Sequence, residues 1–558
     1  MTINFDEDKQ DKRVALLRKQ EEEHLAQTMA ARLGLPYLDL TVVPIDIDAL
    51  RYVSELEARE AQLAVFNVVD KNLDVAVLST ENTQAQTLIK KLQEKGNHVT
   101  LFLVSHTSLE KVWSRYKDLS FSFETKGGAL DISNDQITDF LTSVHTIADV
   151  STLINEVLSM KKAYRISRIL EIILAGAIAV KASDVHLEPE EGYVRLRYRL
   201  DGVLTNILDF DLETFKLLLS RIKLISNLKL NVGNAQDGRF SIKLSNEEIE
   251  IRTSLLPGAY SDSVVLRVLN PQAIATGFAE LGINPHLLKI LMKEIEKPNG
   301  MILNTGPTGS GKTTTLYAFL KKVHVPGIKI ITIENPIEYH LPGIVQTQTD
   351  EKKNYTFIEG LRSALRQDPD VIMVGEIRDK ETAETSVNAA LTGHLVFSTL
   401  HTNNAAGTFP RLVDLGVNPK TLSSAINIAM AQRLVRRLCP DCKHEVVISE
   451  DDKKIIDPIL ESIVDKEQIA GLQREVVFAA EGCEHCNNTG FKGRIGVHEA
   501  ILMNLEIEKV INENLSEREI RKAAAPQGIL DLKQDGVVKV LQGITTLEEL
   551  TRVVDMEE

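Results

Sequence analysis

The sequence predicts a multidomain protein of mixed α/β and α+β class, and three observations support this prediction. The chain has 558 residues, a length that corresponds to three or four domains. From about residue 280, expected helices alternate with short apolar strands, which is the pattern of a doubly wound parallel sheet. One of these strands leads into residues 306–313, a glycine-rich segment that ends in Gly-Lys-Thr and is typical of phosphate-binding loops.

The composition excludes several classes of protein. Hydrophobic residues make up 43% and charged residues 26%, so the chain as a whole is neither disordered nor fibrous. The net charge of −15 argues against a generally basic nucleic-acid-binding surface, although a local basic patch stays open. The longest apolar run, 169–180, is too short to span a bilayer. The first residues lack the pattern of a signal peptide, and we expect a cytoplasmic protein that a partner recruits to the membrane.

Turn signals, composition and hydrophobic periodicity divide the chain into seven predicted segments. They are a charged helix or tail at 1–23, a small α+β domain at 24–117, a linker at 118–148, a second α+β domain at 149–275, a nucleotide-binding α/β domain at 276–437, a four-cysteine subdomain at 438–498 and a helical region at 499–558.

Local patterns place individual elements in the first two domains. Strands are expected at 73–78 and 99–104, with a helix between them. Apolar residues spaced three and four apart predict a helix over 166–178. Residues 193–200 alternate arginines with apolar residues, which predicts a strand with three arginines on one face.

Residues 306–313 fit the pattern Gly-x-x-x-x-Gly-Lys-Ser/Thr, between a strand at 301–304 and a helix at 314–323. Glycines allow such a loop to curl until its backbone N–H groups face phosphate oxygens. Lys312 is expected to reach the β- and γ-phosphates, and Thr313 to hold Mg²⁺. A glycine-rich turn with an incidental lysine is the alternative, which the strand and helix disfavour. The predicted nucleotide-binding residues are Gly306, Pro307, Thr308, Gly309, Ser310, Gly311, Lys312, Thr313 and Thr314.

Four more residues are candidates for the same site. The carboxyl ends of parallel strands meet at one sheet edge, where Glu334 and Glu376 should therefore lie. Glu334 could orient or deprotonate the attacking water, and Glu376 could hold Mg²⁺ through water. The alternative for each is a helix cap or a surface ion pair. His394 and His401 flank another strand, and either could contact the γ-phosphate, with a structural role as the alternative.

The four cysteines form two Cys-x-x-Cys pairs, Cys439 with Cys442 and Cys483 with Cys486. Without an export signal, metal binding explains these pairs better than disulfides do. Four thiolates favour Zn²⁺ in a closed, structural site. The 40 residues between the pairs predict a small subdomain. Unliganded thiols and a redox role are the alternatives.

From about residue 150 to the end, these segments resemble the secretion ATPases, specifically the branch of type IV pilus assembly and type II secretion. Residues 24–117 resemble, more weakly, the N-terminal domain of assembly ATPases. Retraction ATPases usually lack that domain and the four-cysteine insert, which favours assembly or secretion. Besides the phosphate loop, the matching segments are Ala182–Pro189, Gln236–Arg239, the aspartate box Glu334–Glu338, Leu361–Asp370 before a Walker B strand that ends at Glu376, the histidine box Gly393–Thr402, and Gln432–Cys439.

The resemblance implies a RecA-like motor domain, a PAS-like second domain and a zinc-binding insert, assembled as a homohexamer. ATP is expected to bind between the motor domain and the second domain. Its hydrolysis should drive type IV pilus assembly through an inner-membrane platform protein, with type II secretion as the alternative. Arginines that match family motifs are Arg252, Arg267, Arg362 and Arg378, whose rigid fork of donors suits phosphate oxygens. A solvated or ion-paired arginine is the alternative for each.

Two positions depart from the family pattern. Asn335 stands where an aspartate is usual, so an acid that assists Glu334 is in doubt at this position. Asp262-Ser263 stands where the family usually has Glu-Lys. Neither change predicts an inactive enzyme.

Two other interpretations stay open, a nucleic-acid translocase and a non-motor regulatory module, although the acidic charge argues against nucleic acid. Cyclic di-GMP is a further ligand to consider, because residues 32–34 (Arg-Leu-Gly) match part of a motif that binding relatives carry in a longer tandem pattern.

Overall fold

The computed structural model describes residues 21–43, 45–46, 48–69, 72–94, 96–116, 122–125, 129–132, 144–159, 165–230, 233–244, 247–270 and 277–556. Most of the predicted tail at 1–23 and of the predicted linker at 118–148 lies outside these residues. The described chain forms two compact units. One contains the residues up to 133 with 153–172 and 213–222, and the other contains 134–152, 173–212 and the residues from 223 onward.

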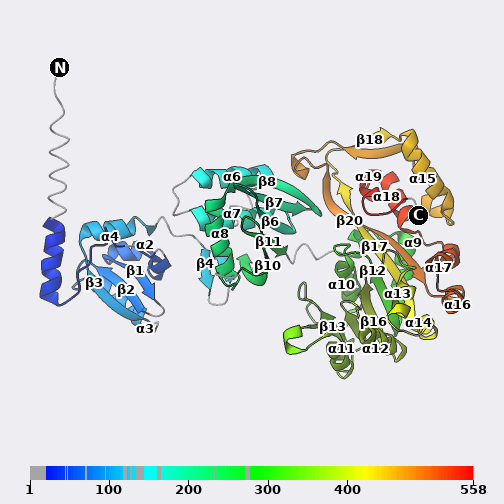
Figure 1. Ribbon diagram of the computed structural model, residues 1–558, viewed down its shortest axis with the longest axis horizontal. Helices are drawn as coiled ribbons and strands as arrows, with labels where there is room; N and C mark the ends of the chain where they lie inside the picture. Colours follow the sequence, from blue (N-terminus) through cyan, green and yellow to red (C-terminus); the bar gives the residue numbers. More distant parts are fainter. Residues whose placement is uncertain are drawn as a thin grey trace, which may run out of the picture. The chain divides into compact units, whose positions relative to one another are not determined.

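The N-terminal domain is built on a three-stranded sheet, coloured blue in Figure 1. Strand β1 pairs with β2 in antiparallel and β2 with β3 in parallel orientation. The two predicted strands and the helix between them are confirmed as β2, β3 and α3, whereas β1 was not predicted. The elements are a helix at 21–33, η1 (Asp48–Tyr52), α2 (Glu55–Glu60), β1 (Leu63–Val69), β2 (Asn72–Val77), α3 (Thr83–Glu94), β3 (His98–Leu103) and α4 (His106–Trp113).

Six antiparallel strands of the second domain lie in the order β9–β10–β11–β6–β7–β8. Strand β7 alternates buried and partly exposed residues, which confirms the predicted arginine face. The elements are a hairpin of β4 (Ser122–Thr125) and β5 (Ala129–Ile132), then α6 (Ile147–Ser159), α7 (Arg165–Ala179), β6 (Asp184–Pro189), β7 (Tyr193–Leu200), β8 (Val203–Asp211), α8 (Leu212–Ile225), β9 (Gln236–Leu244), β10 (Glu247–Pro257) and β11 (Asp262–Leu269).

A seven-stranded sheet in the order β14–β13–β15–β16–β12–β17–β20 forms the centre of the third domain. All neighbouring strands are parallel except β17 and β20, so the predicted parallel sheet is confirmed. Its elements are η5 (Phe278–Glu280), α9 (Pro285–Ile295), β12 (Gly300–Thr305), α10 (Lys312–Val323), β13 (Ile330–Glu334), β14 (Val345–Gln348), η6 (Glu351–Lys353), α11 (Phe357–Leu365), β15 (Val371–Val374), α12 (Lys380–Leu391), β16 (Leu395–Leu400), α13 (Thr408–Asp414), α14 (Pro419–Ala425), β17 (Ile426–Leu438) and β20 (Phe491–Leu502).

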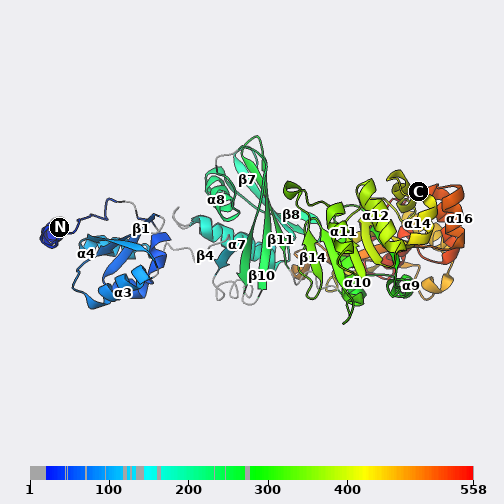
Figure 2. The ribbon, with the colours of Figure 1, turned by 90° about the horizontal axis from the view of Figure 1, so that it is seen from below.

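Helices cover both faces of this sheet, because successive strand residues point to opposite sides. Met301 and Leu303 belong to the core that includes residues of α11 and α12, whereas Ile302 belongs to the core that includes residues of α9 and α10. Figure 2 shows these two pairs of helices on opposite sides of the strands. The double covering explains why β12, β13, β15 and β16 are buried along their whole length.

The segment between β17 and β20 carries its own small elements, and helices follow β20. They are β18 (Lys443–Val447), α15 (Glu450–Ser462), η7 (Lys466–Ile469), β19 (Val476–Ala480), η8 (Glu484–Cys486), α16 (Leu505–Glu513), α17 (Glu517–Ala524), η9 (Ala525–Gln527), α18 (Leu532–Leu541) and α19 (Leu547–Thr551). The boundary predicted at 498–499 falls inside β20, because this strand pairs with β17 along its length and belongs to the sheet. Within the described residues, no helix is long and apolar enough to cross a membrane.

Trp113, the single tryptophan of the chain, makes the N-terminal domain separately observable. Its side chain is 4% exposed, and its Nε1 donates to the backbone oxygen of Leu63 over 3.1 Å. Leu109, fully buried in the same core, precedes it by one turn of α4. Tryptophan fluorescence of the intact chain should therefore report the unfolding of this domain.

We predict that Leu109→Ala lowers the free energy of unfolding of the N-terminal domain by about 2–5 kcal/mol, because it leaves a cavity in the core. Urea titration followed by tryptophan fluorescence measures the change. The control is Leu25→Ala, because Leu25 is 65% exposed and its truncation should change the value by less than about 0.5 kcal/mol. Equal midpoints for the two variants would contradict the prediction.

Candidate functional site

The glycine-rich loop lies between β12 and α10 and curls tightly against β17. A Cβ atom on Gly306 would lie 2.5 Å from the backbone oxygen of Gln432, and φ of Gly306 is +146°, so only glycine fits there. The Lys312 ammonium donates to the backbone oxygens of Gly306 (2.7 Å) and Pro307 (2.9 Å). Thr313 in the first turn of α10 is exposed. The loop thus presents a cation and an exposed hydroxyl at a helix N-terminus, which suits a phosphate with its Mg²⁺.

Burial lowers the pKa of Lys312 to about 8. Glu376 nearby raises the pKa and Arg433 lowers it further. A buried ammonium with a low pKa gains most from an anion placed beside it, because the anion replaces the solvation that burial removed.

Three strand ends bring the other predicted residues to the same edge of the sheet. Strand β13 ends at Glu334, β15 leads into Glu376, and β16 leads into His401. All three strands are parallel to β12, whose carboxyl end carries the loop. The arrangement follows from the sheet order, since β13, β15 and β16 are neighbours beside β12.

Glu334 is 2% exposed, and its carboxylate accepts three hydrogen bonds from side chains of its own chain. Thr332 and Gln346 (3.1 Å) donate to Oε1, and Tyr317 donates to Oε2. Burial raises the pKa of Glu334, while these three hydrogen bonds lower it. The carboxylate is thereby held in one orientation.

Glu376 contacts two of the predicted residues directly. The Arg378 guanidinium lies 2.7 Å from its Oε1, and Nε2 of His401 lies 3.4 Å from its Oε2. Its side chain is 13% exposed. Glu376 is therefore a partly buried carboxylate whose charge acts on the Lys312 ammonium, and its oxygens are of the kind that bind Mg²⁺.

The other predicted arginines differ in their surroundings. Arg252 donates to the backbone oxygen of Ile337 (2.6 Å) and to Glu338 (3.2 Å), in the segment that follows Glu334. Arg267 is 58% exposed and pairs with Asp184 over 3.0 Å. Arg362 is 50% exposed and lies 3.3 Å from both Glu359 and Glu381.

The structure does not bring His394 to the loop. Its backbone oxygen accepts from Gly300 at the start of β12, whereas the loop begins at the other end of that strand. His394 precedes β16 and His401 follows it. Because β16 has six residues, its two ends are about 20 Å apart. Nδ1 of His394 lies 3.1 Å from the backbone oxygen of Ala389 in the preceding helix. Within one chain the geometry fits the structural alternative for this histidine.

Several residues that contact the loop had no predicted role. Gln432 on β17 accepts hydrogen bonds from Asn304 (2.9 Å) and Thr315 (2.8 Å), on either side of the loop. Arg433, 9% exposed, donates to the backbone oxygens of Gln432 and Asn403. Both residues lie in the segment Gln432–Cys439, whose sequence resembles the family. That resemblance did not indicate that they contact the loop.

Glu499 on β20 also escaped the sequence analysis. One of its carboxylate oxygens accepts from the backbone N–H of Ala405 (2.6 Å) and the other from that of Leu532 (3.2 Å). Burial raises the pKa of Glu499, and these N–H groups lower it. The carboxylate ties the segment after His401 to the start of α18.

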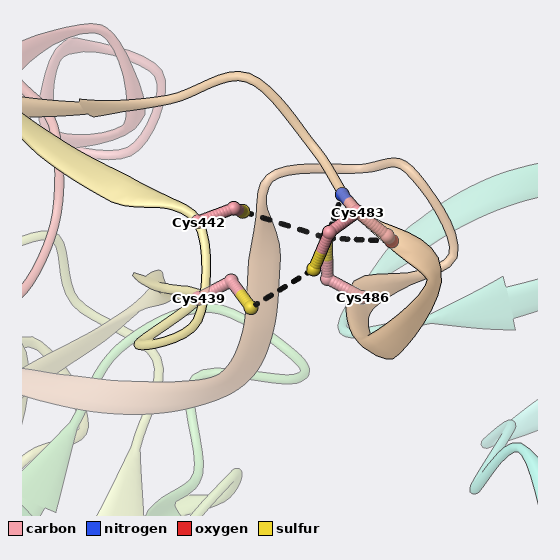
Figure 3. Close-up of side chains that lie close together, drawn as sticks. All are labelled: Cys439, Cys442, Cys483 and Cys486. Atoms are coloured by element: carbon pink, nitrogen blue, oxygen red, sulfur yellow. Dashed lines mark hydrogen bonds between the residues drawn. The ribbon is translucent and has the colours of Figure 1, made fainter.

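The four cysteines converge from the turn that follows β17 and from the segment at η8 before β20, as Figure 3 shows. Their ligand atoms all lie within 4.8 Å of one another. The sulfur distances are 3.9 Å for Cys439–Cys483, 3.9 Å for Cys442–Cys486 and 3.8 Å for Cys483–Cys486. Four sulfurs around one zinc at about 2.3 Å would be about 3.8 Å apart, so the donor set fits tetrahedral Zn²⁺.

Comparisons with known proteins agree with this geometry. The family described as "Type II/IV secretion system protein" matches residues 159–552, and the MshEN domain matches residues 33–122. Type II secretion system protein E of Dickeya dadantii is 38% identical, over 92% of this chain and 99% of that protein. The type IV pilus assembly ATPase PilB of Acinetobacter baylyi is 36% identical, over 95% of this chain and 88% of that protein. The solved structure of the ATPase DotB from Yersinia pseudotuberculosis shares the fold, with a TM-score of 0.51 at 19% identity over 70% of this chain and 94% of that chain.

The cysteine geometry predicts about one zinc ion per chain after purification under reducing conditions. Elemental analysis measures the content. Cys486→Ser should lower it clearly, because the serine hydroxyl is a poor zinc ligand. Finding neither zinc nor iron in the unmodified protein would falsify the prediction.

The lowered pKa of Lys312 predicts that binding of MgATP near pH 8 takes up protons. Phosphate charge stabilises the ammonium, so binding raises the pKa, and affinity should fall as the pH rises above 8. Calorimetric titrations in buffers of different ionisation enthalpy measure the uptake, and Lys312→Ala serves as the control. Equal heats in all buffers would count against a titrating lysine at the loop.

Proposed function

This chain belongs to the type II/IV secretion system protein family and is an ATP hydrolase, and we propose that its hydrolysis drives assembly of a type IV pilus. Both named relatives support an assembly ATPase, one for type II secretion and one for the pilus. Pseudopilus assembly in type II secretion is the alternative.

One observation carries the proposal for the catalytic site. The phosphate loop, Glu334 and Glu376 lie at the carboxyl edge of a single parallel sheet. An ATPase needs a cradle for the phosphates, an acidic ligand near the metal and a base for water, and each is supplied by a separate strand end.

We assign the individual steps as follows from these positions. Lys312 would bind the β- and γ-phosphates, and Thr313 and Glu376 would hold Mg²⁺, which would supply neutralisation of the phosphate charge. Glu334 orients the attacking water and accepts its proton. Arg378 and His401 hold the carboxylate of Glu376 in place.

We further propose that the motor is a homohexamer that acts on an inner-membrane platform protein from the cytoplasmic side. Arg252 and Arg267 on the second domain, with Arg362 and Arg378, stabilise negative charge across the gap between domains. The contact of Arg252 with Ile337 and Glu338 supports a direct link from the second domain to the segment after Glu334. Movement of that domain is thereby coupled to the position of the base.

Cyclic di-GMP binding by the N-terminal domain stays a prediction. The MshEN match over 33–122 supports it. The segment at 32–34 supports it less, because it is a single segment where binding relatives carry a longer tandem pattern.

The test of the proposed function is ATP turnover by the purified full-length chain. We expect the cytoplasmic part of a candidate platform protein to stimulate turnover, and single-stranded DNA to leave it unchanged. Lys312→Ala is the blank, since it removes the cation at the phosphates. Stimulation by DNA alone would overturn the assembly motor and favour a translocase.

A further inference from the structure

Tyr317 links the phosphate-binding helix to the carboxylate assigned as the base. It lies on α10, five residues after Lys312, and its hydroxyl donates to Oε2 of Glu334 on β13. Five residues of helix span about 7.5 Å, so one short, rigid element carries both the phosphate ligand and this donor.

The hydroxyl of Tyr317 is a fixed donor. The side chain is fully buried, and its ring meets that of Tyr339 edge-on at a centroid distance of 4.5 Å. Burial, together with the charge of Glu334, raises the pKa of Tyr317 far above neutral pH. The phenol therefore keeps its proton at neutral pH and donates a hydrogen bond to the carboxylate.

The two oxygens of Glu334 are not equivalent. Oε1 accepts from Thr332 and Gln346, which occupy its two lone pairs. Among the described residues, Oε2 accepts one side-chain hydrogen bond, from Tyr317. The lone pair that is left to receive a proton from water is therefore on Oε2, next to the phenol.

We propose that Tyr317 is a positioning residue for ATP hydrolysis, which fixes Oε2 of Glu334 relative to the phosphate loop. The proposal rests on Glu334 as the base in the proposed function. Tyr317 contacts neither phosphate nor metal ligands in this role. It transmits the position of α10, which holds the phosphates, to the oxygen that takes the proton.

The hydrogen bond has a second effect on the base. Burial favours the protonated form of Glu334, whereas the Tyr317 hydroxyl stabilises the carboxylate and lowers its pKa. Without that hydroxyl the pKa of Glu334 rises, and the base becomes protonated at a higher pH. The acid limb of the rate profile must then move to higher pH.

Tyr317→Phe tests the proposal, because it removes one oxygen and keeps the ring. We expect kcat to fall roughly ten-fold or more, KM for ATP to stay within about two-fold, and the acid limb of kcat to move to higher pH. An unchanged dissociation constant for a non-hydrolysable ATP analogue shows that the variant folds. Tyr116→Phe is the matched control, because it removes a buried hydroxyl, bonded to the backbone of Val53, from the N-terminal domain. It should leave kcat unchanged.

Combination with Glu334→Gln separates the outcomes. If Tyr317 acts through the base, Tyr317→Phe adds no further loss to the residual turnover of Glu334→Gln. An unchanged kcat, a fall in kcat without a shift of the acid limb, or fully additive losses would each overturn the proposal. Near-normal turnover of Glu334→Gln would overturn it together with the assignment of the base. If the platform protein does not stimulate turnover, only the proposed assembly function is contradicted. The kinetic results for Tyr317→Phe then still decide the role of Tyr317.

Discussion

The nucleotide site depends on the close approach of one backbone to another at Gly306. Any side chain there would collide with the backbone of Gln432, so the loop can lie against β17 only because this position carries no Cβ. Because of this contact, β17 can hold the loop in place. Gln432 receives hydrogen bonds from Asn304 before the loop and Thr315 after it, and this fixes the loop at both ends. The cradle is therefore formed jointly by two strands, although its sequence motif belongs to one.

The sheet order then determines which residues can meet the loop. Parallel strands bring their carboxyl ends to one edge, so Glu334, Glu376 and His401 arrive there from segments separated by up to 67 residues. His394 precedes the same strand that His401 follows, and strand length alone places it at the opposite edge. The base is further constrained by Thr332, Gln346 and Tyr317, which saturate three acceptor sites of its carboxylate.

The sequence alone predicts what depends on local pattern, such as the loop at 306–313, the two carboxylates after apolar strands and the paired cysteines. It predicts contacts poorly when they depend on which strands become neighbours. Gln432 reaches the loop across more than a hundred residues, and β20 was divided by a predicted boundary because its pairing with β17 leaves no local signature. Tyr317 was hidden for another reason, since a tyrosine on an apolar helix face looks like ordinary core until its hydroxyl partner is known.

The cysteine cluster lies at one end of the antiparallel pair of β17 and β20, and Gln432 belongs to β17. Cys439 directly follows β17, and Cys486 lies five residues before β20. Side chains along a strand alternate between faces, so a slip of β20 by one residue against β17 would turn Glu499 away from Ala405. A metal ion at the cysteines, about 23 Å from Gln432 along the strand, would forbid that slip. The zinc site would then hold β20 in register with β17, and oxidation of its thiols would first weaken the contact of Glu499 with the segment after His401.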